Sequence, residues 1–231
     1  MNRFLKRAWA EIDLDALEHN YNEIKKLAKG KDILAVVKAN AYGHDDKAVC
    51  LKLQELGVKY YGVSNLWEGE KLRQHGITGT ILTFGYTDED YFDELLEYGI
   101  TQTAGSVQYA KQLSDYAVSK GVKLPVHIKV NTGMTRVGID SQQEMLDIIA
   151  MPGLDCKAAY THFAAADSLD PSDVEYTDRQ QEKLMKIAKD KGLLIHSQNS
   201  GGIIYHGDFG GDIVRAGVIL YGHCLLYTSP S

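Results

Sequence analysis

Eight short apolar segments recur along this 231-residue chain, and longer segments with helical patterning separate them. The short segments are rich in Val, Ile and Tyr, and most lack the alternation of a strand that has one face in water. This pattern is typical of strands that are buried on both faces in a parallel sheet. The eight expected strands are residues 33–37, 60–63, 80–84, 100–103, 126–130, 157–160, 193–196 and 212–216.

The segments between the expected strands carry the end signals of helices. An acidic residue or Ser stands at most starts, and Gly follows most ends. Strands that alternate with helices indicate right-handed βαβ units. Eight such strands in a chain of this length favour an α/β fold of the (β/α)8 TIM-barrel type over an open doubly wound sheet. The expected helices are residues 45–56, 66–75, 88–98, 106–120, 142–151 and 177–191, with a shorter helical turn after Asn199.

The two ends of the chain do not fit a complete barrel. Residues 9–14 read as an extra strand, and a helix that begins near Asp15 follows it. After residue 216 no segment is long enough for an eighth helix, so we expect exposed apolar surface in its place. The expected buried face of the first helix consists of Leu17, Tyr21, Ile24 and Ala28. The expected divisions are an N-terminal strand segment (1–14), a barrel (15–222) and a tail without periodicity (223–231).

Charge, hydropathy and cysteine usage exclude several classes of function. The chain has 25 basic and 31 acidic residues, a net charge of −6, and no basic stripe, so we expect no nucleic-acid partner. No run of about 18 apolar residues is present, so we expect no membrane span. Cys50, Cys156 and Cys224 are far apart and form no C-x-x-C pair. Neither a disulfide framework nor a zinc site is expected, and a reducing cytoplasm is the simpler context.

Lys38 follows directly on the first expected strand. A lysine in this position is either a surface cap or a functional amine, and a lone lysine is more often the former. In a (β/α)8 barrel, however, the active site lies at the carboxyl ends of the strands. A lysine that is desolvated there has a depressed pKa and becomes a nucleophile, which Schiff-base chemistry requires.

Small and polar residues follow the seventh and eighth strands, where barrels of this type often bind phosphate. The loop 199–202 (Asn-Ser-Gly-Gly) offers an amide, a hydroxyl and backbone N–H groups, and Gly217 adds further backbone donors. Alone, such a loop is more often a simple turn. Together with Lys38 it suggests pyridoxal phosphate (PLP), which needs a covalent lysine, a phosphate site and a partner for its ring nitrogen. Arg215 is the candidate for that partner.

Three further charged or aromatic residues stand at strand ends. His162 is either a satisfied core histidine or a ring that stacks on a planar cofactor. Lys129 and Arg136 are either surface charges or part of the site, and Gly133 between them lets the backbone approach a ligand. An arginine in this position can bind a substrate carboxylate through two hydrogen bonds.

Several of these segments resemble those of one family. Residues 35–44 (Ala-Val-Val-Lys-Ala-Asn-Ala-Tyr-Gly-His) resemble the PLP-attachment signature of alanine racemases. Residues 129–138 are similar to the family's K-x-x-T-G-M-x-R-x-G segment. The likeness extends over nearly the whole chain, from about Trp9 to Gly222, and includes residues 9–14, 160–164 and 214–222.

The resemblance implies a fold-type III PLP enzyme that interconverts L- and D-alanine for peptidoglycan precursors. It implies that Lys38 holds PLP covalently and serves as the general base on one face of the substrate. His162 would stack on the pyridine ring, and Arg215 would face the ring nitrogen with His196 behind it. The implied phosphate contacts are Tyr42, Ser200, Gly217 and Val218, with Asn199 beside them.

The resemblance also implies how the substrate is held and what completes the site. Arg136 would bind the substrate carboxylate, the backbone of Met134 would lie at the substrate end, and Lys129 would be carbamylated and orient Arg136. Racemisation needs a second base on the opposite face, and the family takes it from a C-terminal β-domain of the partner subunit in a homodimer. Residues 9–14 would join that β-domain. From Cys224 onward the sequence no longer resembles the family, so we expect a truncated barrel with impaired activity and with Tyr221 and Tyr227 in the wrong context to be the second base.

Two other functions remain compatible with the sequence. A racemase for another amino acid, such as serine, would share the fold and most of the motifs. A non-catalytic PLP-carrier barrel would have about this length, but its lysine motif would differ and it would lack Lys129 and Arg136 in this arrangement.

Overall fold

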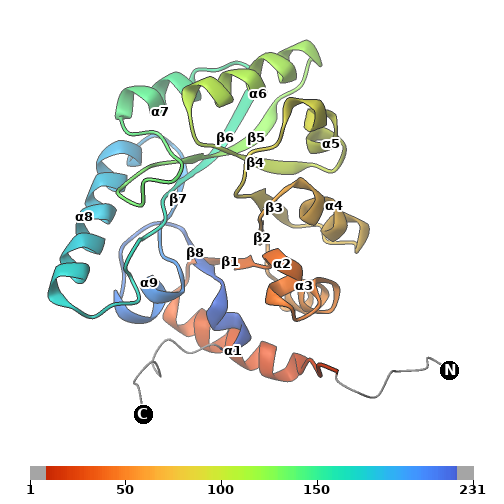
Figure 1. Cartoon of the computed structure of the whole chain (residues 1–231), viewed down its shortest axis with the longest axis vertical. Helices are drawn as coiled ribbons and strands as arrows, with labels where there is room; N and C mark the ends of the chain where they lie inside the picture. The colour runs from red at the N-terminus through yellow and green to blue at the C-terminus, as the bar shows by residue number, and fades with distance from the viewer. Residues whose placement is uncertain (1–8, 223–231) are drawn as a thin grey trace.

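A computed structural model describes residues 9–222 as eight parallel strands that close into a barrel, with helices around the outside (Figure 1). Each strand pairs with its neighbours in sequence, and the first pairs with the eighth. The (β/α)8 prediction is therefore confirmed. The strands are β1 (Asp32–Val36), β2 (Tyr60–Val63), β3 (Thr80–Thr83), β4 (Ile100–Ala104), β5 (Leu124–Lys129), β6 (Leu154–Tyr160), β7 (Leu194–His196) and β8 (Ile213–Ala216).

The expected helices follow the strands in order, with two differences in their bounds, and the structure adds two short helices that were not predicted, α2 (Lys38–Tyr42) and η2 (Val218–Tyr221). The predicted helix 88–98 is divided into η1 and α5, and α8 begins six residues before the predicted start, at Pro171. Proline is well suited to the first turn of a helix because it lacks an N–H that would have no partner there. The helices are α1 (Leu14–Leu27), α2 (Lys38–Tyr42), α3 (Asp46–Glu55), α4 (Leu66–Gln74), η1 (Glu89–Tyr91), α5 (Phe92–Glu97), α6 (Val107–Ser119), α7 (Gln142–Ile149), α8 (Pro171–Ala188), α9 (Ser200–Tyr205) and η2 (Val218–Tyr221). None of these described helices is long and apolar enough to cross a membrane.

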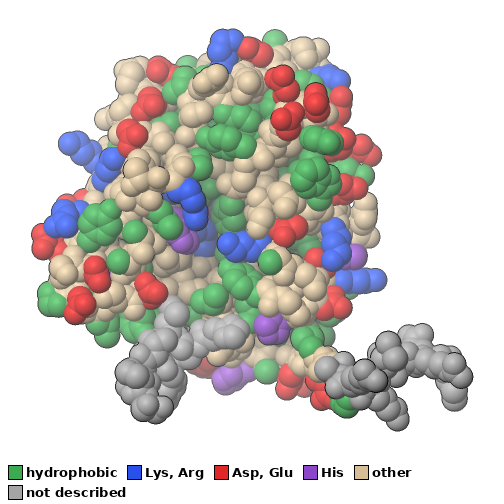
Figure 2. All heavy atoms as spheres, viewed as in Figure 1, with side chains coloured by type: hydrophobic (Ala, Val, Ile, Leu, Met, Phe, Trp, Pro, Cys, Tyr) green, Lys and Arg blue, Asp and Glu red, His purple; other side chains and the backbone are tan. Residues whose placement is uncertain are grey.

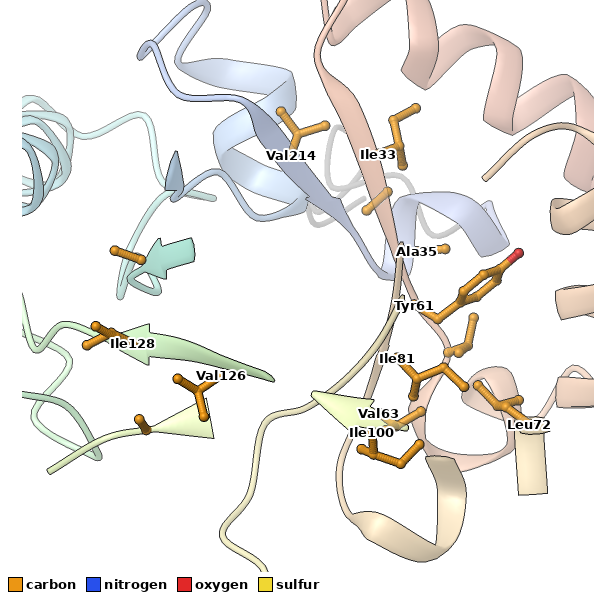
Figure 3. Packing of buried hydrophobic residues seen from close by; sticks show 14 of the residues in the cluster. Ile33, Ala35, Tyr61, Val63, Leu72, Ile81, Ile100, Val126, Ile128 and Val214 are labelled. Atoms are coloured by element: carbon orange, nitrogen blue, oxygen red, sulfur yellow. The ribbon is translucent and has the colours of Figure 1, made fainter. Parts of the chain in front are cut away.

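The main core lies between the outer face of the barrel and the ring of helices. Figure 3 shows Tyr61, Ile81 and Ile100 of β2, β3 and β4 on the side where Leu72 of α4 lies. These four side chains are almost fully buried. A second, smaller cluster that includes Leu34 of β1 packs separately from this layer. The short apolar strands therefore bury both faces, as their lack of alternation predicted.

Helix α1 occupies the position of an eighth helix. It packs against η2, which follows β8, and also against α3 and α9, the helices on either side of the β8–β1 seam. Its predicted inner face is confirmed, because Leu17, Tyr21, Ile24 and Ala28 are all buried. No long helix follows β8 within residues 9–222, but the apolar surface expected to be exposed there is covered by α1.

The expected strand at residues 9–14 is not formed among the described residues, and its place in a β-domain stays a prediction. Residues 9–13 form no regular element, and α1 begins at Leu14 with the Asp13 carboxylate accepting hydrogen bonds from Asp15 N–H and Ala16 N–H. A strand needs the backbone of a neighbouring strand, and none of the described strands lies beside this segment. The predicted tail, residues 223–231, lies outside the described residues, as do residues 1–8.

Candidate active site

The barrel interior is polar on the side of β5 to β8. Lys129 on β5 pairs in register with Tyr160 on β6, Tyr160 pairs with His196 on β7, and Arg215 on β8 pairs with Leu34 on β1. Partners on adjacent strands point to the same face of a sheet, so these side chains form one inward-facing row. On the opposite side the interior is apolar, with Leu34, Val36 and Leu82. At the carboxyl ends of the strands, this partly polar and partly apolar interior opens into a cavity.

A cavity of about 490 Å³ lies at the carboxyl ends of the strands. Figure 2 shows a hollow near the centre of the molecular face, with Lys or Arg and His side chains inside it. Eleven of the twelve site residues predicted from the sequence line the cavity, and His196 lies buried behind Arg215. The lining residues among the predicted set are Lys38, Tyr42, Lys129, Met134, Arg136, His162, Asn199, Ser200, Arg215, Gly217 and Val218.

The lining also contains residues that the sequence analysis did not single out. Tyr160 is 3% exposed and stacks on His196, with ring centroids 4.7 Å apart and an angle of 6° between the planes. Its hydroxyl shares a hydrogen bond with the Thr103 hydroxyl, and burial raises its pKa to about 12. Tyr160 was visible in a family-like segment, but its inward position follows only from the strand register. The other unpredicted lining residues are Val36, Phe84, Val137, Phe163, Ala164 and Asp167, and Gly201 belongs to the predicted loop 199–202.

Lys38 stands at the start of a left-handed turn. Four consecutive residues without glycine, 39–42, have φ between 53° and 56°, and Gly43 follows with φ 88°. Left-handed backbone costs about 1–2 kcal/mol per residue for L-amino acids, so this turn persists only because its surroundings hold it. The strain lies directly beside the lysine that the sequence predicts to be functional.

Two side chains of α4 and a backbone N–H of α3 hold this turn in place. The Glu68 carboxylate accepts hydrogen bonds from Ala39 N–H at 2.8 Å and from Ser64 N–H at 2.7 Å. Asn40 Oδ1 accepts from Asp46 N–H at 3.1 Å and from the Lys71 ammonium at 3.5 Å. The turn also brings the Tyr42 ring against Tyr221, with centroids 5.1 Å apart.

Ser200, Gly217 and Tyr42 meet at one end of the cavity. Ser200 Oγ accepts a hydrogen bond from Gly217 N–H at 3.2 Å. A Cβ on Gly217 would lie 3.2 Å from Tyr42 Oη and 3.8 Å from Ser200 Oγ, so the absence of a side chain leaves both hydroxyls open to a ligand. The Asn199 side chain accepts from Gly202 N–H and fixes the start of α9 beside them. The predicted phosphate residues therefore lie together.

Four of the five N–H groups of Arg215 already have acceptors. Nη1 donates to His196 O at 2.8 Å and to His196 Nδ1 at 3.2 Å. Nη2 donates to Thr161 O at 2.6 Å and to Ser197 O at 2.8 Å. Within residues 9–222 the Nε–H group has no such acceptor, so it is the donor that remains for a ligand. Burial lowers the pKa of Arg215 to about 10, which leaves the guanidinium charged at neutral pH.

The histidines around this arginine are neutral. Burial lowers the pKa of His127 to about 3 and shifts that of His196 well below its ordinary value. Burial, followed by the nearby cations Arg215 and Lys129, lowers the pKa of His162 to about 3. A neutral imidazole at position 162 is compatible with stacking on an aromatic ring.

Lys129 is the most perturbed cation of the site. Its side chain is 7% exposed, and burial, together with the charges of Arg215 and Arg136, lowers its pKa to about 7. Its ammonium lies 5.2 Å from the centroid of the Tyr160 ring and donates to Val130 O at 3.2 Å. The cavity lining contains one carboxylate, that of Asp167, and four basic side chains, those of Lys38, Lys129, Arg136 and Arg215. This balance favours an anionic ligand, and within the described residues no cluster of His, Cys, Asp and Glu could hold a metal ion.

The closed parallel barrel and its polar, mainly basic cavity at the strand ends define an α/β-barrel protein with a candidate active site at the carboxyl ends of its strands. The chain belongs to the alanine racemase N-terminal domain family, which it matches over residues 12–224. This family is PLP-dependent.

Comparisons with individual proteins agree with this family assignment. The chain is 39% identical over 233 residues to an alanine racemase of Clostridium perfringens, covering 96% of this chain and 60% of that protein. The solved alanine racemase of Clostridium difficile 630 superposes with a TM-score of 0.89 at 36% identity, covering 96% of this chain and 60% of that one. A histidine racemase from Leuconostoc mesenteroides gives 0.83 at 28% identity, covering 91% and 58%. The chain therefore spans about 60% of the length of its relatives.

Proposed function

We propose that this chain is the cofactor-binding barrel of an alanine racemase and that the complete site interconverts L- and D-alanine. One observation carries the proposal: a single cavity brings together Lys38, the Ser200–Gly217 pair and Arg215, although more than 150 residues separate the first from the others. A covalent lysine, a phosphate site and a ring-nitrogen partner are what PLP requires of a protein.

The residues present fit PLP. Ser200, Tyr42, Gly217 and Val218 would hold the phosphate, with Asn199 beside them, because two hydroxyls converge where Gly217 leaves space. Lys38 would form the covalent link, and the neutral His162 would stack on the ring. When bound, PLP spreads over its ring the negative charge that develops at the substrate Cα.

Arg215 determines the protonation of the ring nitrogen. Its free Nε–H would donate to that nitrogen, and a guanidinium that stays protonated at neutral pH would disfavour a second proton between them. A ring kept without that second proton would withdraw electrons less strongly, so Arg215 would limit side reactions such as transamination. His196 lies behind Arg215 and accepts from its Nη1.

Lys129 and Arg136 form the carboxylate end of the site. Arg136 binds the substrate carboxylate, and the backbone of Met134 lies beside it. The pKa of about 7 leaves part of Lys129 as a neutral amine, which can add CO2 and release a proton to form a negatively charged carbamate. That charge would relieve the repulsion with the two arginines and orient Arg136. Carbon-13 NMR after addition of labelled bicarbonate tests this step, and loss of the carbamate signal in Lys129→Met assigns it.

Lys38 supplies one of the two bases that racemisation needs. Its amine would accept the Cα proton from one face of the substrate. The base for the opposite face is proposed to be a tyrosine of the partner subunit's C-terminal β-domain in a homodimer. D-Alanine for peptidoglycan is the proposed use of the product, and the cysteine pattern is the basis for a cytoplasmic location.

Deuterium exchange tests the proposal without requiring the second base. The chain is incubated with PLP and either enantiomer of alanine in D2O, and the Cα proton is followed by NMR. We expect an absorbance band from lysine-bound PLP and Cα exchange of one enantiomer, both lost in Lys38→Ala and both kept in Lys47→Ala, an exposed lysine outside the cavity. A PLP band that survives in Lys38→Ala would overturn the cofactor assignment.

The same experiment separates the two alternatives. PLP binding without exchange of any amino acid would favour a PLP-carrier barrel, although Lys129 and Arg136 in the cavity wall favour a site with a substrate carboxylate. Faster exchange with serine than with alanine would favour a serine racemase.

A further inference from the structure

His127 lies beneath the residues assigned to the cofactor and has no part in the function proposed above. It is on β5, two residues before Lys129, and its side chain is 1% exposed. Its Nδ1 lies 3.1 Å from His196 Nε2, with ring centroids 5.1 Å apart and the planes at 67°. Arg215, His196 and His127 therefore form a buried chain of three side chains that leads away from the cavity.

The donor at one end of this chain fixes the direction of every hydrogen bond in it. Arg215 can only donate, so His196 Nδ1 must accept and carries no proton. A neutral imidazole has one N–H, so the proton of His196 is on Nε2, which donates to His127 Nδ1. The proton of His127 is then on its own Nε2. Both imidazoles are neutral because burial lowers their pKa values.

A second cavity lies at the His127 end of these three hydrogen-bonded side chains. It has a volume of about 330 Å³, and His127 lines it together with Thr101, Thr80, Pro125 and Leu194. These residues lie at or near the amino ends of their strands, on the side of the barrel opposite to the active-site cavity. His127 Nε2–H has no protein acceptor within the described residues, so this cavity offers it space for a water molecule.

We propose that His127 is a positioning residue of the site: as the acceptor for His196 Nε2–H, it holds His196 in the tautomer that accepts from Arg215 and so keeps Arg215 Nε–H directed at the cavity. This inference rests on the proposed function for its use but not for its geometry. Without an acceptor at position 127, His196 either buries an unpaired N–H or changes tautomer. The change of tautomer puts a hydrogen on His196 Nδ1, where it faces the Arg215 donor, and Arg215 must then move.

Nitrogen-15 NMR of the histidines tests the proposal without cofactor. In the wild-type chain we expect His196 with an unprotonated Nδ1 and a protonated Nε2, and a coupling across the hydrogen bond to His127 Nδ1. His127→Asn keeps an acceptor near the Nδ1 position and should keep the His196 tautomer. His127→Leu removes the acceptor and should give a mixture of tautomers, whereas His19→Leu, a change of an exposed histidine, should leave His196 unaltered.

The effect on the cofactor is measured separately. We expect PLP affinity to fall about ten-fold in His127→Leu and to be largely restored in His127→Asn, since one buried hydrogen bond contributes about that factor. A wild-type His196 protonated on Nδ1 would overturn the proposal even if neither variant folds, and so would an unchanged tautomer in His127→Leu. If the wild-type chain does not bind PLP, the proposed function fails while the NMR result still decides the role of His127.

Discussion

Lys129 gives the sharpest test of the electrostatics of this site. Its pKa of about 7 in the folded chain compares with 10.5 for an ordinary lysine, mainly because burial removes water from the ammonium. Each pKa unit corresponds to about 1.4 kcal/mol, so the charged side chain opposes folding by about 5 kcal/mol below pH 7. Replacement by Met keeps the approximate volume and removes the charge.

The penalty depends on pH in a defined direction. Between pH 7 and 10.5 the unfolded chain binds the Lys129 proton and the folded chain does not, so this residue makes stability rise with pH. The remaining penalty at pH 9 is about 2 kcal/mol by the same conversion. Loss of the hydrogen bond to Val130 O costs about 1 kcal/mol at any pH, because Thr161 still donates to that carbonyl. Lys129→Met should therefore stabilise the fold by about 4 kcal/mol at pH 6 and by about 1 kcal/mol at pH 9.

Urea unfolding in CO2-free buffer at pH 6 and pH 9 measures both values, with and without the substitution. Lys157→Met is the matched control, because that lysine is 55% exposed and pairs with Asp155 at the surface. Its effect should be small at both pH values. An equal effect of Lys129→Met at pH 6 and pH 9 would refute the assignment of a lowered pKa to this residue.

Three further changes address the cofactor end of the site. Gly217→Ala should leave stability within about 1 kcal/mol but weaken PLP binding about ten-fold, measured by absorbance titration, because the new methyl would stand 3.2 Å from Tyr42 Oη. Gly201→Ala, the matched control, should instead destabilise the fold by about 1–3 kcal/mol in urea, because its Cβ would lie 2.6 Å from the carbonyl oxygen of Ala166. Arg215→Lys should cost about 3 kcal/mol in the same assay, since one ammonium cannot replace four hydrogen bonds; a change below 1 kcal/mol would contradict this. Glu68→Gln should speed hydrogen exchange at the Ala39 amide about ten-fold, and unchanged exchange would show that the carboxylate does not hold the turn.

Much of the barrel could be predicted because its signals are local. Short apolar runs and glycines just after helices are set by residues near in sequence, and the eight strands were found with small errors at their ends. The face of α1 was also correct. The position of α1 could not be predicted, because a helix that precedes β1 fills the gap after β8, and this neighbourhood exists only once the barrel closes.

The left-handed turn after Lys38 could not be predicted for a related reason. Of the four residues only Asn40 is of a type that adopts positive φ without glycine, and it does so as a single residue, not in a run of four. Their conformation is imposed by Glu68 and Lys71, about 30 residues later in the chain. The motif marked the position as functional, but only the structure identifies the strain beside Lys38 and the contacts that maintain it.

The sequence does contain a pattern that indicates the polar interior of the barrel. Along β5, His127 and Lys129 alternate with Val126, Ile128 and Val130. In an isolated sheet such alternation indicates a face in water, and that interpretation makes His127 a surface residue. In a closed barrel whose outer face is covered by helices, water is not available on that side, and the polar positions must point inward. Alternation in a barrel strand therefore indicates interior chemistry, and the same argument that places Lys129 in the cavity places His127 one layer below it.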